Sequence, residues 1–438
     1  MISAPPSLHI TARDVDLPGG LVALLPHLNP SGTWIRGGEG MIGLGIAAST
    51  TATGQGRFDS LSVFWDSLIE SRAAGESGHG PVALVSVAFS KDSESASQLL
   101  VPEVLIRREG GKTTLLLITD RPEPDAQVLD RHGLWLEPTG GLRATHPAPA
   151  ADLSEARLLP GIQSERQYLS AIAAGLSAIH DGTVDKLVLA RDVLVTAEAP
   201  VPIGTLLSRL ATEYPQTWTY CVGAGPGVPQ TLLGATPEML VRLRGTQLSS
   251  RVLAGTIDRA QRTSTLVRDA KQHREHDLAV TSLLEQLRPI TDTLQSPTEP
   301  SVLQLPNVYH LASDISGKLA ADSSGRLPSP LKVAEAAHPT AAVCGTPTTT
   351  AADLIAQLEG MDRGPYAGPV GWMDAEGNAD FGIALRGGVF EDDVTPAGGR
   401  RLRIFAGCGV VAGSEPESEL AETKVKLKPM LWALGLDP

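Results

Sequence analysis

Short apolar runs alternate with clusters of Gly, Pro and Ser over residues 1–150. Runs of this kind at 41–47, 82–89 and 113–120 have the length and the Val, Ile and Leu content of β-strands. Residues 121–160 are rich in Pro, Glu, Ala and Asp, which indicates a connection on the surface. We therefore expect the first 150 residues to form strands and loops that complete one fold with the rest of the chain.

The pattern changes in the second region, 151–438. Ser164 and Gln167 have the spacing of a helix capping box, and apolar residues then recur at helical spacing until Gly182. Further helices are predicted at 263–288, 351–361 and 416–435. Strands are predicted at 186–195, 217–224, 231–243, 247–256, 302–319 and 401–411, and as a pair around a tight turn within 370–390. Because strands outnumber helices and several follow one another directly, we expect a large α/β (α+β) fold of antiparallel sheets flanked by helices.

Composition narrows the class of partner. The chain has 438 residues, of which 42% are hydrophobic, so it can bury a sizeable core. Its formal net charge is −13, from 36 Lys and Arg against 49 Asp and Glu. Such an acidic balance argues against nucleic acid and against anionic membranes as partners. It does not exclude an anionic small molecule, because a pocket can carry local positive charge.

The cysteines indicate the compartment. Cys221, Cys344 and Cys408 are widely spaced, odd in number and without metal-site spacing, which predicts a reduced, cytoplasmic protein without a disulfide framework. The N-terminal segment lacks the basic and apolar regions of a signal peptide. No apolar run reaches the length of a membrane-spanning helix, so no membrane association is expected.

The predicted closing helix carries acidic residues with a lysine. Glu419, Glu422 and Lys426 fall on one helical face, because residues three and four apart are neighbours there. An exposed ladder of Glu–Lys pairs is the simplest interpretation of this face. Alternatively, its two glutamates supply oxygen ligands to a hard cation such as Mg²⁺ together with Glu275 of the 263–288 helix.

Two other interpretations of the 263–288 helix stay open. His273 and His276 are three residues apart and, with Glu275, form a weak candidate for a zinc site. The same residues equally fit a solvated helix face.

Glycine-rich segments and isolated charges mark further candidates. Glycines at 253–256, 344–347, 363–372 and 405–411 allow backbone amides to approach an anion, but none of these segments has the pattern of a nucleotide-binding loop. Lys186 and Glu238 border apolar strands, and Arg386 ends one. Burial lowers the pKa of lysines and raises that of glutamates, which would suit an acid–base pair near neutral pH, whereas surface positions are the alternative.

Ten segments then occur in a recognisable order. They are DKLVLAR (185–191), LLGATPEML (232–240), LAGT (253–256), HREHD (273–277), VYHLASDISGKL (308–319), HPTAAVCGTP (338–347), RGPYAGPVGW (363–372), FGIALR (381–386), FAGCGVV (405–411) and SEPESELAETKVKL (414–427). Together they resemble the chorismate-utilising enzymes, which include isochorismate synthase, salicylate synthase and the large subunits of anthranilate and aminodeoxychorismate synthases. The resemblance covers roughly 160–435 and implies a fold like that of anthranilate synthase component I.

The resemblance implies a role for each matching residue. Lys186 corresponds to the general base that activates water, and Glu238 to the general acid that protonates the departing hydroxyl. Glu275 and Glu422 correspond to direct ligands of Mg²⁺, and Glu419 to a ligand through water. Substrate-binding positions are implied for Arg386, Lys426, Gly407, Gly409, Tyr366, Thr256 and Ala342. Gln272 departs from the family pattern, which often has an acidic residue there, so the outer metal shell is expected to be less charged.

Two positions favour one member of the family. Ala342 resembles isochorismate synthases, whereas salicylate synthases tend to have Thr there. Lys186 favours water over ammonia as nucleophile, so we expect no glutamine amidotransferase subunit, and the resemblance favours a monomer. The expected activity is Mg²⁺-dependent conversion of chorismate to isochorismate, for menaquinone or siderophore biosynthesis. Salicylate synthase and a non-catalytic chorismate-binding protein are the alternatives.

Overall fold

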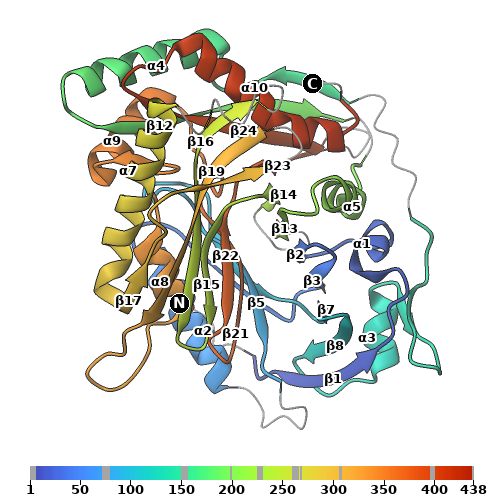
Figure 1. Cartoon of the computed structure of the whole chain (residues 1–438). Helices are drawn as coiled ribbons and strands as arrows, with labels where there is room; N and C mark the ends of the chain where they lie inside the picture. Colours follow the sequence, from blue (N-terminus) through green and yellow to red (C-terminus); the bar gives the residue numbers. More distant parts are fainter. Residues whose placement is uncertain are drawn as a thin grey trace.

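The computed structural model describes residues 6–71, 79–148, 156–197, 200–223, 230–258, 266, 269–304, 308–394 and 400–436. Two large sheets face each other at its centre, and helices cover their outer faces (Figure 1). The pairings between neighbouring strands in both sheets are antiparallel, as the sequence predicts. The predicted fold class is therefore confirmed.

The larger sheet combines strands from both ends of the chain. Its order is β1 (His9–Val15), β8 (Lys112–Thr119), β7 (Val104–Glu109), β3 (Glu39–Leu44), β2 (Gly32–Arg36), β13 (Trp218–Val222), β14 (Thr231–Thr236), β23 (Gly387–Val394), β24 (Arg400–Val411), β12 (Lys186–Thr196) and β11 (Arg157–Pro160), with β20 (Gly345–Thr346) paired to β12. A separate hairpin is formed by β9 (Leu134–Leu136) and β10 (Leu142–Ala144).

The smaller sheet also mixes early and late segments. Its order is β17 (Thr291–Gln295), β19 (Val308–Leu319), β16 (Gln247–Asp258), β15 (Met239–Arg244), β22 (Ala379–Ile383), β21 (Pro369–Asp374), β5 (Val82–Ser86), β6 (Ser97–Val101) and β4 (Ala48–Ala52), with β18 (Ser301–Gln304) paired to β19. Strands from the first 150 residues thus occur in both sheets.

The helices form two outer groups and a few short elements. Along the outer face of the smaller sheet lie α2 (Arg57–Glu70), α7 (Ala270–Leu287) and α8 (Pro330–Ala337) (Figure 1). Against β12 and β24 lie α4 (Glu165–His180), α9 (Thr348–Glu359) and α10 (Pro416–Ala433). The others are α1 (Gly20–Leu24), η1 (Leu25–His27), α3 (Asp125–Arg131), α5 (Ile203–Glu213) and η2 (Arg288–Ile290). No described helix is both long and apolar enough to cross a membrane.

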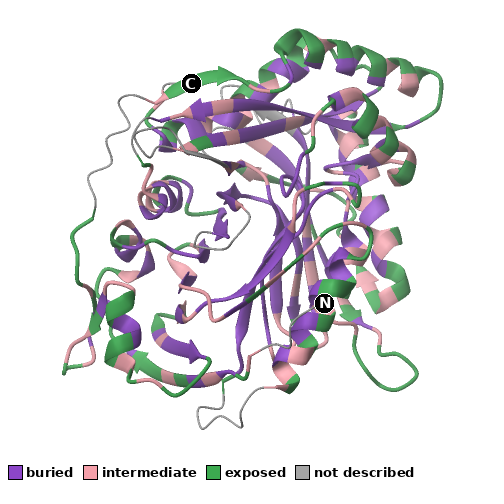
Figure 2. Cartoon of the chain, turned by 180° about the vertical axis from the view of Figure 1, so that it is seen from behind, coloured by how far each residue is buried: buried purple, intermediate pink, exposed green. Residues whose placement is uncertain are grey.

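Local sequence signals explain several of these elements. The capping box of α4 is present, because the Ser164 hydroxyl accepts from the Gln167 backbone and the Gln167 side chain accepts from the Ser164 backbone. Asp269 caps α7 through its side chain, which accepts from the backbone N–H groups of Lys271 and Gln272. Figure 2 shows buried residues concentrated on the strands and on the helix faces that turn toward them.

Some predictions about elements are wrong. Residues 121–160 are not a simple connection, because they contain α3, the β9–β10 hairpin and β11. The single strand predicted at 231–243 is two strands in different sheets, β14 and β15. The helix predicted from residue 263 is described as α7 from Ala270 onward, and residues 263–265 lie outside the described part.

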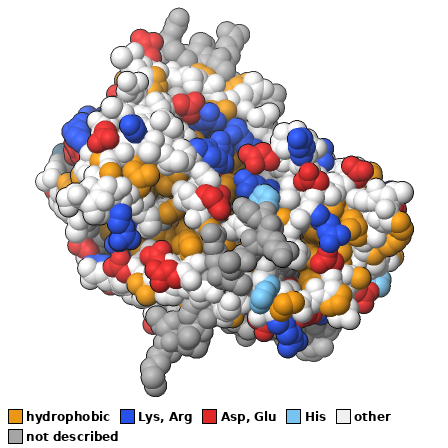
Figure 3. Space-filling model, turned by 90° about the horizontal axis from the view of Figure 1, so that it is seen from below, with side chains coloured by type: hydrophobic (Ala, Val, Ile, Leu, Met, Phe, Trp, Pro, Cys, Tyr) orange, Lys and Arg blue, Asp and Glu red, His pale blue; other side chains and the backbone are white. Residues whose placement is uncertain are grey.

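The end of the sandwich away from α4 and α10 is basic. Figure 3 looks onto this end, where Lys and Arg side chains gather in a hollow of the surface. Arg242 lies over the ring of Trp218 at 5.9 Å, and Arg107 lies over the ring of Trp372 at 5.3 Å. Each of these contacts joins a strand of one sheet to a strand of the other, so cation–π packing holds the sheets together here.

A buried ion pair ties α9 to the larger sheet. Arg363 donates to Glu359 Oε2 at 2.9 Å, to the Val188 carbonyl at 2.7 Å and to the Val343 carbonyl at 2.9 Å. Glu359 also accepts the Ala190 backbone N–H at 2.7 Å. Both side chains are almost completely buried. The pair therefore fixes β12 relative to the loop that precedes β20.

We expect Glu359→Ala to destabilise the protein by about 3–5 kcal/mol, because Arg363 would keep a buried charge without its partner. Urea unfolding measures this change. The control is Asp314→Ala, which breaks the exposed pair with Arg251 and should cost no more than about 1 kcal/mol. Equal effects of the two substitutions would contradict the argument.

Candidate active site

The chain crosses twice from one sheet to the other at the same place. The first crossing, at Pro237 and Glu238, joins β14 to β15, and the second, at 384–386, joins β22 to β23. The crossings are hydrogen-bonded to each other's strands, since the Ile383 N–H donates to the Glu238 carbonyl and the Ala235 N–H donates to the Arg386 carbonyl. Both crossings line one pocket between the sheets.

The first crossing buries a carboxyl group. The Glu238 side chain lies in the pocket wall, and the residue is only 4% exposed. Burial raises the pKa of Glu238 to about 7, although the Leu253 backbone N–H and the charges of Lys186, Lys426 and Arg386 oppose this shift. The desolvation expected from the sequence is thus present, and Glu238 can hold a proton near neutral pH.

The second crossing presents a cation. Arg386 has a left-handed backbone, with φ of 51°, which is costly for a residue with a side chain. The Tyr220 hydroxyl donates to the Leu385 carbonyl at 3.0 Å, and a side chain at Gly387 would collide with that hydroxyl. Arg386 donates to Nε2 of His310 at 3.3 Å. These contacts hold the strained backbone conformation at Arg386. They also direct its guanidinium group into the pocket.

His310 is a pocket residue that the sequence did not single out. It lies on β19, and burial lowers its pKa well below the usual range, with the charges of Arg386 and Lys426 acting in the same direction. The imidazole is therefore neutral and can accept the hydrogen bond from Arg386. Its place in the segment 308–319 was visible, but a lone histidine in a strand gives no signal of its own.

A buried lysine and a glutamate lie against a glycine. Lys186 begins β12 and is fully buried, and its Nζ lies 3.2 Å from Oε1 of Glu275 without forming a well-oriented hydrogen bond. Gly409 on β24 lies beside this pair, and a Cβ added to it would stand 2.1 Å from the Glu275 carboxylate oxygen. Gly409 is required because only a bare backbone leaves room for the carboxylate.

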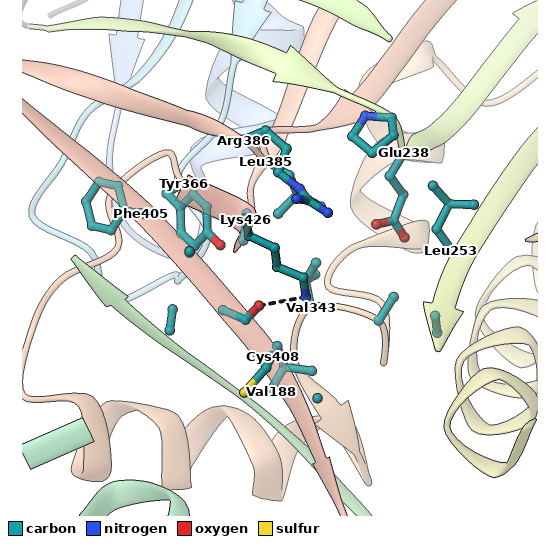
Figure 4. Close-up of a pocket in the computed structure, with 18 of the residues that line it drawn as sticks. Val188, Glu238, Leu253, Val343, Tyr366, Leu385, Arg386, Phe405, Cys408 and Lys426 are labelled. Atoms are coloured by element: carbon teal, nitrogen blue, oxygen red, sulfur yellow. Dashed lines mark hydrogen bonds between the residues drawn. The ribbon is translucent and has the colours of Figure 1, made fainter. Parts of the chain in front are cut away.

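Lys426 closes the adjacent part of the pocket. Its Nζ donates to the Gly407 carbonyl at 2.8 Å and lies 2.6 Å from Oε1 of Glu422. Figure 4 shows this hydrogen bond, with the tips of Arg386 and Lys426 between Tyr366 and the Glu238 carboxyl. The Gly407 carbonyl thus positions the ammonium group of Lys426.

The polar face of α10 is turned toward the pocket. Glu419 is only 2% exposed and lies 2.6 Å from Nζ of Lys271 on α7. Burial and the charge of Glu422 raise the pKa of Glu419, and Lys271 opposes that rise. An exposed Glu–Lys ladder is therefore the wrong interpretation of this face.

The remaining predicted residues lie as follows. Tyr366 and Ala342 line the pocket, and the Tyr366 ring stacks on Phe405 with 4.9 Å between centroids. The Thr256 backbone pairs with His310, and its side chain lies outside the described part.

The zinc hypothesis finds no support. His276 is buried, its Nδ1 lies 3.1 Å from the Ala254 carbonyl, and its Nε2 lies 2.8 Å from the Ser313 hydroxyl. Burial lowers the pKa of His276 to about 4. Because both ring nitrogens are engaged with β16 and β19, this histidine is structural.

The three glutamates predicted as metal ligands come from two helices, α7 and α10. Each lies beside a different lysine: Glu275 beside Lys186, Glu419 beside Lys271, and Glu422 beside Lys426. Among the described residues, no three acidic, His or Cys side chains are already arranged as a metal shell. Mg²⁺ prefers oxygen donors and usually takes one or two carboxylates together with waters and substrate oxygens, so the three glutamates fit this ion.

Comparison with known proteins defines the class. Residues 35–435 match a family model described as chorismate binding enzyme, and the chain belongs to this family. The isochorismate synthase DhbC of Bacillus subtilis is 33% identical over 398 residues, which cover 88% of each chain. The isochorismate synthase EntC of Escherichia coli K12 is 35% identical over 282 residues, covering 63% of this chain and 68% of EntC.

Solved structures agree with the fold. A structure of DhbC from Bacillus anthracis has a TM-score of 0.73 and 26% identity, and covers 95% of this chain and 100% of its own. Anthranilate synthase component I from Streptococcus pneumoniae has a TM-score of 0.69 at 20% identity, covering 89% of this chain and 91% of its own, and shows a likeness of fold alone.

We expect Glu238→Gln to stabilise the protein at pH 8 by about 3 kcal/mol. Folding raises the pKa of Glu238 to about 7. The free energy of unfolding of the wild type therefore falls as the pH rises from the pKa of the unfolded chain through 7, because the buried carboxyl must then ionise. Below the unfolded pKa the wild-type carboxyl is protonated in both states, so the advantage should vanish at pH 4. Unfolding free energies at both pH values measure this, and an equal advantage at both would contradict the raised pKa.

Proposed function

We propose that the protein is a Mg²⁺-dependent isochorismate synthase, an isomerase that moves a hydroxyl group on chorismate. The observation that carries the proposal is the pocket between the crossings. It combines a buried acid with a pKa of about 7 and two cations, Arg386 and Lys426. The buried amine of Lys186 lies next to Glu275 of the pocket lining and has no well-oriented hydrogen bond. The relatives named isochorismate synthase support the same assignment.

The residues divide the reaction into three tasks. Arg386 and Lys426 bind one carboxylate of the chorismate dianion, because charge-assisted hydrogen bonds are strong in a partly buried site. Lys186 accepts a proton from a water molecule as that water attacks C2 of the ring. Glu238 donates its proton to the C4 hydroxyl as it departs as water. One C–O bond forms while another breaks, so the reaction is readily reversible.

Mg²⁺ completes the charge balance in this proposal. Glu275 and Glu422 would hold the ion directly, and Glu419 through water, as the resemblance implies. When bound, the ion neutralises one substrate carboxylate. The other carboxylate is the one that Arg386 and Lys426 bind.

The proposal extends to the setting of the enzyme. We infer a cytoplasmic monomer that acts without an amidotransferase subunit, and the three free, buried cysteines fit a reducing compartment. Isochorismate would feed menaquinone or siderophore biosynthesis.

A product assay tests the proposal directly. The protein is incubated with chorismate, with and without Mg²⁺, and the products are separated by chromatography. Isochorismate formed only with Mg²⁺ is the expected result. Salicylate with pyruvate would instead identify a salicylate synthase, and chorismate binding without turnover would identify a non-catalytic binding protein.

We expect Lys186→Ala to lower kcat by at least about a hundredfold, because a general base contributes factors of this size. Binding of chorismate should change little, since other residues supply those contacts. The matched control is Lys424→Ala, which removes an exposed lysine of α10 that pairs with Glu165. Turnover by Lys186→Ala equal to that of the control would remove Lys186 from the mechanism.

The pH profile follows from the pKa of Glu238. The acid must be protonated to act, so the falling limb of kcat/KM should follow the pKa of Glu238, with activity lost as the pH rises through about 7. Initial rates at saturating Mg²⁺ between pH 6 and about 9 measure the profile. A profile that keeps rising to pH 9 would assign the acid to another group.

A further inference from the structure

The ammonium group of Lys271 lies beside one of the three candidate metal ligands. Nζ of Lys271 is 2.6 Å from Oε1 of Glu419, a carboxyl that is almost fully buried. This ion pair bridges α7 and α10, the two helices that carry the three candidate ligands. Lys271 thus places a cation next to the candidate metal ligands.

The position of Lys271 is unfavourable for its own helix. It lies in the first turn of α7, where Asp269 caps the free N–H groups. The positive end of the helix dipole repels a cation at this place. The carboxylates across the gap between α7 and α10, rather than helix stability, account for a lysine here.

Lys271 differs from the other two lysines paired with these glutamates. Lys426 lines the pocket that receives substrate, and Lys186 lies against Glu275, which also lines it. Lys271 is not among the residues that line that pocket and is directed at Glu419. Its charge thus acts on the metal ligands rather than on the substrate.

We propose that the ammonium group of Lys271 competes with Mg²⁺ for the carboxylate of Glu419. Its ammonium neutralises Glu419 in the metal-free protein and repels an entering Mg²⁺, so the site binds Mg²⁺ more weakly than its carboxylates alone would. This inference rests on the Mg²⁺ site of the proposed function. It explains how buried carboxylates remain stable without metal while the ion stays exchangeable.

Calorimetric titration with MgCl₂ alone, on the full chain without substrate, tests the inference. Lys271→Met keeps the length of the side chain and removes its charge, and we expect Mg²⁺ to bind about tenfold tighter or more, because cations a few ångströms apart repel strongly. Lys271→Arg keeps the charge and should stay near the wild-type affinity. Lys424→Met is the matched control, since it removes an exposed charge of α10 paired with Glu165.

Thermal unfolding gives a second readout that does not depend on activity. Without Mg²⁺, Lys271→Met should melt below the wild type, because Glu419 loses its nearest cation. Added Mg²⁺ should then raise its melting temperature by more than that of the wild type, since tighter binding to the folded state stabilises it more. Lys271→Gln serves as a second uncharged variant and is expected to behave alike.

The outcomes separate two failures. Equal or weaker Mg²⁺ binding by both uncharged variants, beside normal binding by the wild type, overturns the competitor role alone. Absence of Mg²⁺ binding in the wild type and in both variants overturns the proposed metal site and the competitor role with it.

Discussion

Pairing of buried charges is the constraint on which this pocket depends. Ionised groups removed from water are costly unless an opposite charge stands close by, and three glutamates here each lie beside a lysine. Glu238 is the exception, because burial outweighs the surrounding cations and raises its pKa to about 7. The same constraint thus creates both a balanced group of ions and one carboxyl group able to carry a proton.

The two sheet crossings fix the positions of the charged side chains in the pocket. A strand that continued in one sheet would point alternate side chains to opposite faces. The breaks at Pro237 and at 384–386 instead place Glu238 and Arg386 between the sheets, in backbone that is hydrogen-bonded across the crossings. Tyr220 and the bare backbone of Gly387 make the left-handed turn at Arg386 possible. The rigid sheets thereby hold the acid and the cation at fixed positions.

Sequence patterns predicted the fold class and most elements, because apolar periodicity and the α4 capping box are local signals. They could not show that 231–243 changes sheets, since a continuous apolar run looks the same on either side of a crossing. Order-preserving motifs identified several of the residues that line the pocket, among them Glu238, Arg386 and Lys426. Burial of Glu419 was missed because its partner Lys271 lies on another helix, and a Glu–Lys face resembles an exposed ladder until the neighbouring helix is known.

The pairing of β12 with β24 also affects how the protein folds during synthesis. Lys186 at the start of β12 lies opposite Val411, and 411 − 186 gives a separation of 225 residues; such distant contacts form slowly. Helix α10, which carries Lys426, Glu419 and Glu422, follows β24 and so is synthesised after the strands of both sheets. The pocket is therefore incomplete until α10 has been synthesised. A truncation before α10 removes activity even if both sheets form.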